Sequence, residues 1–247
     1  MDVDSFFQAE GITEYSIVRI KDLPLADQSG PLHLVPGACS VIVFGSEIPV
    51  PYYDLPPQEK TRNMLRIAEL LDGTADRLVA HLAAEKFRSA GVPFFLPLCV
   101  KSGQVQGIVR LKQVASCGGL GTPGKSTILL SPRYGARLVL SGVVTEMETD
   151  CPKRSLEQNF CRNCGLCMQS CPGRAISPHW VDAFRCRNIS PWIPAPFIPA
   201  ARWLLGREYV QRLFAPYAHL VARHASMRCS LCVTVCPCFK SGENTKG

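Results

Sequence analysis

The chain has 247 residues, of which 47% are hydrophobic and 19% charged, with a formal net charge of +7. This apolar content supports a buried core, which excludes a disordered or collagen-like protein. The chain also contains thirteen cysteines. The first residues show no basic region followed by an apolar stretch, and no stretch is long enough for a transmembrane segment. We therefore expect a cytoplasmic protein whose thiols stay reduced and bind metal.

The first 150 residues predict an α/β or α+β domain. A short helix and a strand are expected within residues 6–20, and a β-branched strand over 39–44. Apolar residues at intervals of three and four predict a long helix over 58–87, bent at Asp72-Gly73. Two further strands are expected over 107–111 and 137–145.

The basic charge is concentrated in residues 86–145, which contain eight Lys and Arg and no Asp or Glu. One interpretation is a buried sheet whose few charged residues are basic by chance. The other, which we favour, is an anion site for a phosphate, a carboxylate or an acidic redox partner.

A glycine-rich loop in this block, residues 119–126, matches the G-x4-G-K-[ST] pattern of a phosphate-binding P-loop. A P-loop must open a helix of several turns, and Pro132 prevents such a helix soon after the loop. We therefore expect the loop to contact an anionic group of a cofactor rather than to hydrolyse a nucleotide. The candidate cofactor or substrate contacts in and after the loop are Gly121, Lys125, Ser126, Tyr134 and Arg137.

Four cysteines follow with the spacing C-x2-C-x2-C-x3-C-P, at Cys161, Cys164, Cys167 and Cys171. This is the spacing of bacterial ferredoxins, in which three thiolates bind one [4Fe-4S] cluster and the fourth binds another. A zinc site would instead favour two separate pairs of cysteines. The run therefore predicts iron–sulfur clusters and electron transfer.

A second cysteine set repeats the C-x2-C-x3-C-P ending at Cys229, Cys232 and Cys236. By the crossover rule of two-cluster ferredoxins, Cys236 completes the cluster of Cys161, Cys164 and Cys167. The cluster of Cys171, Cys229 and Cys232 then lacks one ligand. Cys186 is the preferred candidate, and Cys238 and Cys151 are the alternatives.

Loop and cysteines together resemble epoxyqueuosine reductases and the related reductive dehalogenases. The similar residues are Gly119-Leu-Gly-Thr-Pro-Gly-Lys125-Ser-Thr-Ile-Leu-Leu130, Tyr134-Gly135, the strand after it, the first cysteine run and Asp182-Ala-Phe-Arg-Cys186. The resemblance implies a nitroreductase-like domain over 1–150 and a ferredoxin-like two-cluster domain over 151–247. It also implies cobalamin beside one cluster, with flavin as the alternative, and supports Cys186 as the eighth ligand.

The chain departs from this family in two respects. The family's Asp proton donor precedes the glycine loop, but residues 86–145 contain no acid, and neither Cys99 nor Lys101 can be assigned its role. The family's carboxy-terminal helical repeats, which bind tRNA, have no counterpart here, which argues against tRNA as a partner. An insertion over 187–228, rich in Pro and aromatic residues, packs on the cluster domain, covers the cofactor, or contacts a partner or membrane surface.

The favoured function is an iron–sulfur oxidoreductase that passes single low-potential electrons through two clusters to a corrinoid or a substrate. A ferredoxin or flavodoxin would be the electron donor. The alternative is a non-catalytic electron-transfer partner, or a reductive activator, of a corrinoid enzyme.

Overall fold

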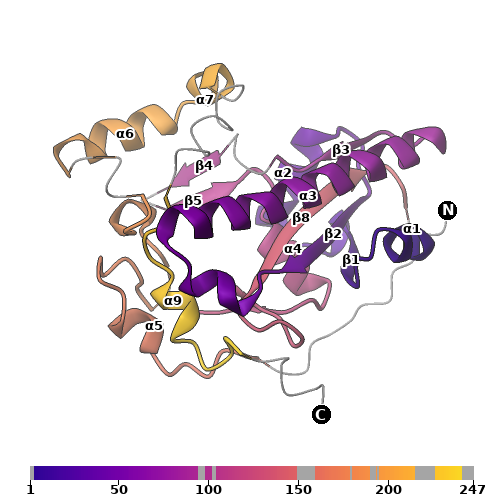
Figure 1. Cartoon of the computed structure of the whole chain (residues 1–247). Coiled ribbons are helices and arrows are strands. Elements are labelled where there is room, and N and C mark those ends of the chain that lie inside the picture. Colours follow the sequence, from indigo (N-terminus) through magenta and orange to yellow (C-terminus); the bar gives the residue numbers. More distant parts are fainter. Residues whose placement is uncertain are drawn as a thin grey trace, which may run out of the picture.

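A computed structural model describes residues 3–93, 98–101, 104–148, 159–178, 180–189, 193, 195–214 and 226–240. The fold is mixed α+β, as the sequence predicts (Figure 1). Its helices are α1 (Val3–Ala9), α2 (Leu25–Leu34), α3 (Pro57–Ala84), α4 (Leu111–Cys117), α5 (Leu166–Gln169), α6 (Ile198–Leu205), α7 (Glu208–Phe214) and α9 (Leu231–Thr234). Its strands are β1 (Glu14–Arg19), β2 (Ser40–Glu47), β3 (Ser89–Gly91), β4 (Leu98–Lys101), β5 (Gln104–Gly107), β6 (Thr122–Pro123), β7 (Leu129–Leu130) and β8 (Leu138–Thr145).

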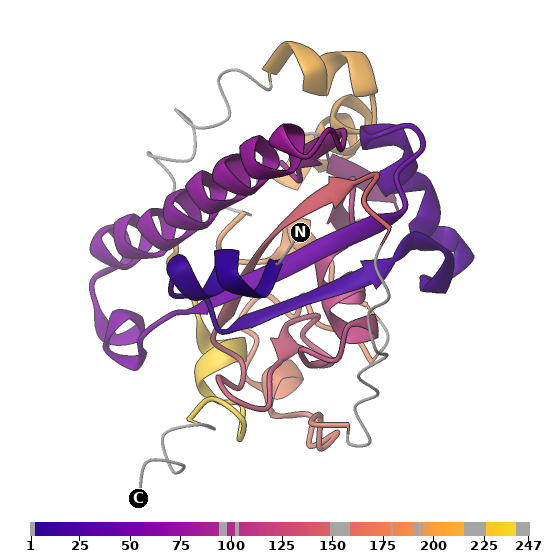
Figure 2. The same ribbon diagram turned by 90° about the vertical axis from the view of Figure 1, so that its right-hand side faces the viewer.

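The main sheet has four antiparallel strands in the order β1-β2-β8-β3. Both faces of β2 are covered, so its sequence is a continuous apolar run rather than an alternating one. Ile42 and Phe44 pack with α1 and α3, whereas Val41 and Val43 pack on the opposite face with α4. Figure 2 shows α3 and α1 on the same face of the sheet. The predicted strands over 39–44 and 137–145 are confirmed.

The 28-residue helix α3 confirms the predicted long helix, and Asp72 and Gly73 both lie within it. Its buried residues recur at helical spacing, including Met64, Ala68 and Leu71. None of the described helices is long and apolar enough to cross a membrane.

The prediction of a strand over 107–111 is wrong. Strand β5 ends at Gly107, and α4 begins at Leu111. The apolar residues there are buried for a different reason, because Val109 and Val114 pack under the sheet with Leu120. The glycine-rich loop thus follows a helix and forms a small β6–β7 hairpin, so it lacks the strand-to-helix setting of a P-loop.

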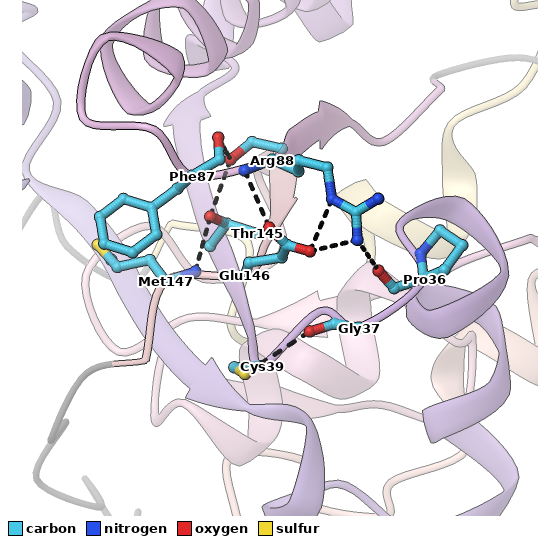
Figure 3. A network of polar contacts seen from close by, with 9 residues as sticks. Pro36, Gly37, Cys39, Phe87, Arg88, Thr145, Glu146 and Met147 are labelled. Carbon is cyan, nitrogen blue, oxygen red and sulfur yellow. Dashed lines mark hydrogen bonds and ion pairs between the residues drawn. The ribbon is translucent and has the colours of Figure 1, made fainter.

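A polar network at the carboxyl end of β8 connects three segments (Figure 3). The Arg88 Nε atom donates to Glu146 Oε1 at 2.7 Å, and Arg88 Nη2 donates to the Pro36 carbonyl at 2.9 Å. The Thr145 hydroxyl oxygen accepts from Ser89 Oγ and from the Met147 amide. These bonds fix the chain as it leaves the sheet.

The cysteine-rich part packs against the amino-terminal end of α3, where α5 and α9 lie (Figure 1). Lys60 Nζ donates to Ser230 Oγ at 3.3 Å, and the Thr61 hydroxyl accepts from the Met227 amide at 2.6 Å. The insertion contributes α6 and α7, which stand above β4. The described part of the insertion is therefore partly helical.

Candidate metal centre

The thiols of Cys161, Cys164, Cys167 and Cys236 lie together and line one pocket, which we call the first thiol group. Asn163 and Gly165 adopt positive φ angles of 53° and 74°, which turn the loop back on itself between the cysteines. Burial raises the pKa of Cys167, and negative charge at Cys161 and Cys164 raises it as well. The crossover prediction for Cys236 agrees with this placement.

The thiols of Cys171, Cys186, Cys229 and Cys232 form a second thiol group. Burial, and then negative charge at the other three cysteines of the group, raise the pKa of Cys232 to about 11. Burial also raises the pKa of Cys186, with further contributions from Cys229 and Cys171. The structure thus brings Cys186 to the three cysteines that the sequence left one ligand short.

Backbone amides point at sulfur atoms in both groups. The Ala175 amide donates to Cys171 Sγ at 3.3 Å, and the Asn188 amide donates to Cys186. The Met168 amide donates to Cys167 in the first group. Such N–H···S bonds stabilise thiolate charge and are one determinant of the potential of an iron–sulfur cluster.

Two residues that the sequence analysis did not identify hold the second group together. The Asn188 side chain donates to the Cys229 carbonyl and accepts from the Cys229 amide, both at 2.9 Å. Gly173 lies so close to Arg185 that an added Cβ would be 2.0 Å from its carbonyl oxygen. These contacts join the segments of Cys171, Cys186 and Cys229, and no spacing rule could reveal them because the partners are far apart in sequence.

The other two candidates for the eighth ligand differ in position. Cys238 is buried beside the first group, where its thiol donates to the Phe160 carbonyl at 3.3 Å. Burial raises the pKa of Cys236 to about 11, and negative charge at Cys238 contributes to this rise. Cys151 lies outside the described residues. Of the candidates in the described structure, Cys186 is therefore the one with the second group.

Four cysteine thiols per group are the kind of donor set that a [4Fe-4S] cluster requires. Among the described residues, no three His, Cys, Asp or Glu side chains converge closely enough to hold a single metal ion. Ligands of one tetrahedral zinc would lie about 3.8 Å apart, given Zn–S bonds of about 2.3 Å. A four-iron core is larger than a single ion, so its four thiolate ligands lie further apart. Each group supplies four such sulfur ligands.

The glycine-rich loop borders the first thiol group. Gly124, Lys125 and Ser126 line the same pocket as its cysteines. Gly121 is buried, and a Cβ there would lie 2.5 Å from the Leu130 carbonyl oxygen, so close packing of the hairpin requires glycine at this position. The Tyr134 ring lies beneath the Arg133 guanidinium, 5.2 Å from it.

Arg137 is buried, with 1% of its surface exposed. Its Nε donates to the Phe239 carbonyl at 2.6 Å, and its Nη1 pairs with Glu47. It therefore connects the sheet to the end of the cysteine-rich part. Contact of Gly121, Lys125, Ser126, Tyr134 or Arg137 with a second cofactor stays a prediction.

The folded structure redistributes the basic charge of residues 86–145. Each of its four arginines pairs with a carboxylate from outside the block: Arg88 with Glu146, Arg110 with Asp27, Arg133 with Glu14, and Arg137 with Glu47. Lys112 lies on α4, where its residue is exposed. In the described part of the block, the arginines are therefore paired with carboxylates, whereas Lys86, Lys112 and Lys125 form no ion pair.

The fold is that of epoxyqueuosine reductases and a reductive dehalogenase. An epoxyqueuosine reductase solved with a tRNA-Tyr epoxyqueuosine-modified stem loop matches with a TM-score of 0.59 and 19% identity, over 98% of this chain and 65% of that one. A dehalogenase whose structure suggests a mechanism for B12-dependent dehalogenation matches with a TM-score of 0.51 and 18% identity, over 71% of this chain and 25% of that one.

Sequence comparison leads to the same proteins. Epoxyqueuosine reductase of Gloeobacter violaceus is 27% identical over 139 residues, which are 53% of this chain and 36% of the relative. That of Bacillus cereus is 22% identical over 211 residues, 85% of this chain and 50% of the relative. The chain is thus epoxyqueuosine reductase-like and dehalogenase-like, as its motifs indicate. It matches no family model and spans half or less of these relatives' length.

Proposed function

We propose that the chain is an iron–sulfur reductase that passes single electrons through two [4Fe-4S] clusters to a cobalamin-type cofactor or substrate. The observation that carries the proposal is the presence of eight cysteines in two groups of four, with Cys186 beside Cys171, Cys229 and Cys232. The names of the similar proteins, all reductases or dehalogenases, support the reductive direction.

The ligands we assign are Cys161, Cys164, Cys167 and Cys236 for the first cluster, and Cys171, Cys186, Cys229 and Cys232 for the second. When bound, each cluster supplies a one-electron couple. The chain's own groups hold the thiolates and donate N–H···S bonds to them. Each electron that enters from a donor protein such as ferredoxin or flavodoxin leaves to the acceptor, so the donor is oxidised by one electron per transfer.

The acceptor is proposed from one similar structure, that of the dehalogenase with a B12-dependent mechanism. We place the acceptor over residues 1–150, the part we propose as a nitroreductase-like domain, and the clusters in a ferredoxin-like domain over 151–247. No carboxylate from residues 86–145 can protonate a substrate there, because the block contains none.

Anaerobic purification with iron, sulfide and corrinoid analysis tests this function. We expect about eight irons per chain, a number that two four-iron clusters require, and a change in the absorption spectrum of added cobalamin when the clusters are reduced. About eight irons without any spectral response of cobalamin would support the alternative, a non-catalytic electron-transfer partner. Fewer than four irons would contradict both.

A second candidate is reduction of an epoxyqueuosine-modified tRNA. The similar structure that contains such a stem loop covers 98% of this chain, which bears against our expectation that tRNA is not a partner. Binding of a modified stem loop, compared with an unmodified one, separates this candidate from the first.

A further inference from the structure

The first thiol group has a lysine in its wall that the proposed electron transfer does not yet use. Lys125 lines the pocket together with Cys161, Cys164, Cys167 and Cys236, and it is half-buried. Among the described residues it has no hydrogen bond or ion pair. The arginines of the same block are all committed to carboxylates, so Lys125 differs from them.

A fixed positive charge beside a cluster favours its reduced form. Reduction adds one negative charge to the core, so a nearby ammonium group stabilises the product of reduction more than the starting state. Partial burial limits the screening of this interaction by water and salt. Because Lys125 lines the pocket, its charge lies within a side-chain length of whatever the four thiols bind and can act on its reduction potential.

We propose that the positive charge of Lys125 raises the reduction potential of the first cluster relative to that of the second. This inference rests on the proposed function and changes the role expected for the loop. Lys125 would act on the charge of the cluster instead of binding an anionic group of another cofactor. Lys112 lies on α4 and does not line this pocket, so it offers a control position.

The test is an anaerobic redox titration of the iron-loaded full chain, followed by electron paramagnetic resonance. At the wild-type midpoint of the first cluster, we expect K125Q to lower the ratio of reduced to oxidised cluster about tenfold, which is 59 mV for a one-electron couple. K125R keeps the charge and should stay near the wild-type ratio. K112Q is the matched control and should leave the first cluster unchanged.

The first cluster's signal can be isolated in a Cys186→Ser background, in which only the first group keeps all four thiols. An unchanged ratio in iron-loaded K125Q would overturn the inference while leaving the proposed function intact, whereas a wild-type chain that binds no clusters would overturn the proposed function itself. If K125Q loses iron, retention of iron by K125R supports a role of the charge, and equal loss in both variants contradicts it. A K125Q variant with an unchanged potential and weaker cobalamin binding would restore the anion-site interpretation.

Discussion

The two thiol groups have the same number of cysteines but are assembled in different ways. Three thiols of the first group come from one seven-residue loop, Cys161 to Cys167, which its own turns shape. The second group combines segments around Cys171, Cys186 and Cys229, which are held by the bonds of Asn188 and the close approach of Gly173. The first site is thus mostly a local structure, whereas the second depends on long-range contacts.

The largest expected effect comes from removing the thiol of one candidate eighth ligand, Cys186 or Cys238. We expect Cys186→Ser to lower the iron content from about eight to about four per chain, because the second group then has only three thiols. Cys238→Ser should keep about eight, since its thiol bonds to Phe160. Iron analysis of anaerobically purified protein measures both. Loss of four irons from the Cys238 variant instead would reverse the assignment.

A change that touches no thiol should still damage the second group. Gly173→Ala places a methyl group against the Arg185 carbonyl, so the Cys171 segment must move away from Cys186. We expect loss of the second cluster's resonance signal with the first retained. Gly73→Ala is the control, because its Cβ would meet only the flexible end of Arg77, and alanine favours a helix interior. Equal damage to both clusters would contradict the proposed division.

A milder change weakens the same site. Asn188→Ala removes both side-chain bonds to Cys229, and loss of groups that orient metal ligands commonly costs about 10-fold to 100-fold in affinity. We expect an iron chelator to remove the second cluster about tenfold faster than in the wild type. Asn188→Asp keeps the acceptor for the Cys229 amide and should be intermediate. A rate equal to wild type in both variants would show that the Asn188 side-chain bonds are dispensable for the second cluster.

The smallest effect lies outside both groups, at the contact between α3 and β8. Burial raises the pKa of Asp72 to about 6, and the Ser141 hydroxyl, 3.4 Å away, opposes this shift. The folded state thus favours the neutral carboxyl, so the stability contribution of Asp72 is complete below its usual pKa of 3.8 and is lost as pH rises through 6.

Asp72→Asn should therefore stabilise the protein at pH 8, by about 1 kcal/mol after allowance for partial exposure, and the gain should shrink toward pH 5. Denaturant midpoints of the iron-loaded protein between pH 5.5 and 8 measure it, with the exposed Asp54→Asn as control. A pH-independent gain would assign the effect to packing instead of charge.

Sequence alone determined the local features, because they depend on spacing within a few residues. The cysteine run, the β-branched strand predicted over 39–44 and the apolar stripe of α3 all follow from such patterns. The crossover rule of two-cluster ferredoxins added Cys236 as the expected partner of the run. Tertiary structure was needed wherever distant segments meet. It placed Cys186 in the second group, set the glycine loop beside the first, and showed that the arginines of residues 86–145 pair with carboxylates from elsewhere.

The strand predicted over 107–111 failed for the same reason. A short apolar run is buried equally well in a strand or in the start of a helix, and only its packing under the sheet decides between them. The pairing of charged residues also depends on the tertiary structure. A count along the chain cannot show which cations find partners, because partners are set by distance in space, and in this fold that leaves Lys125 beside the thiols.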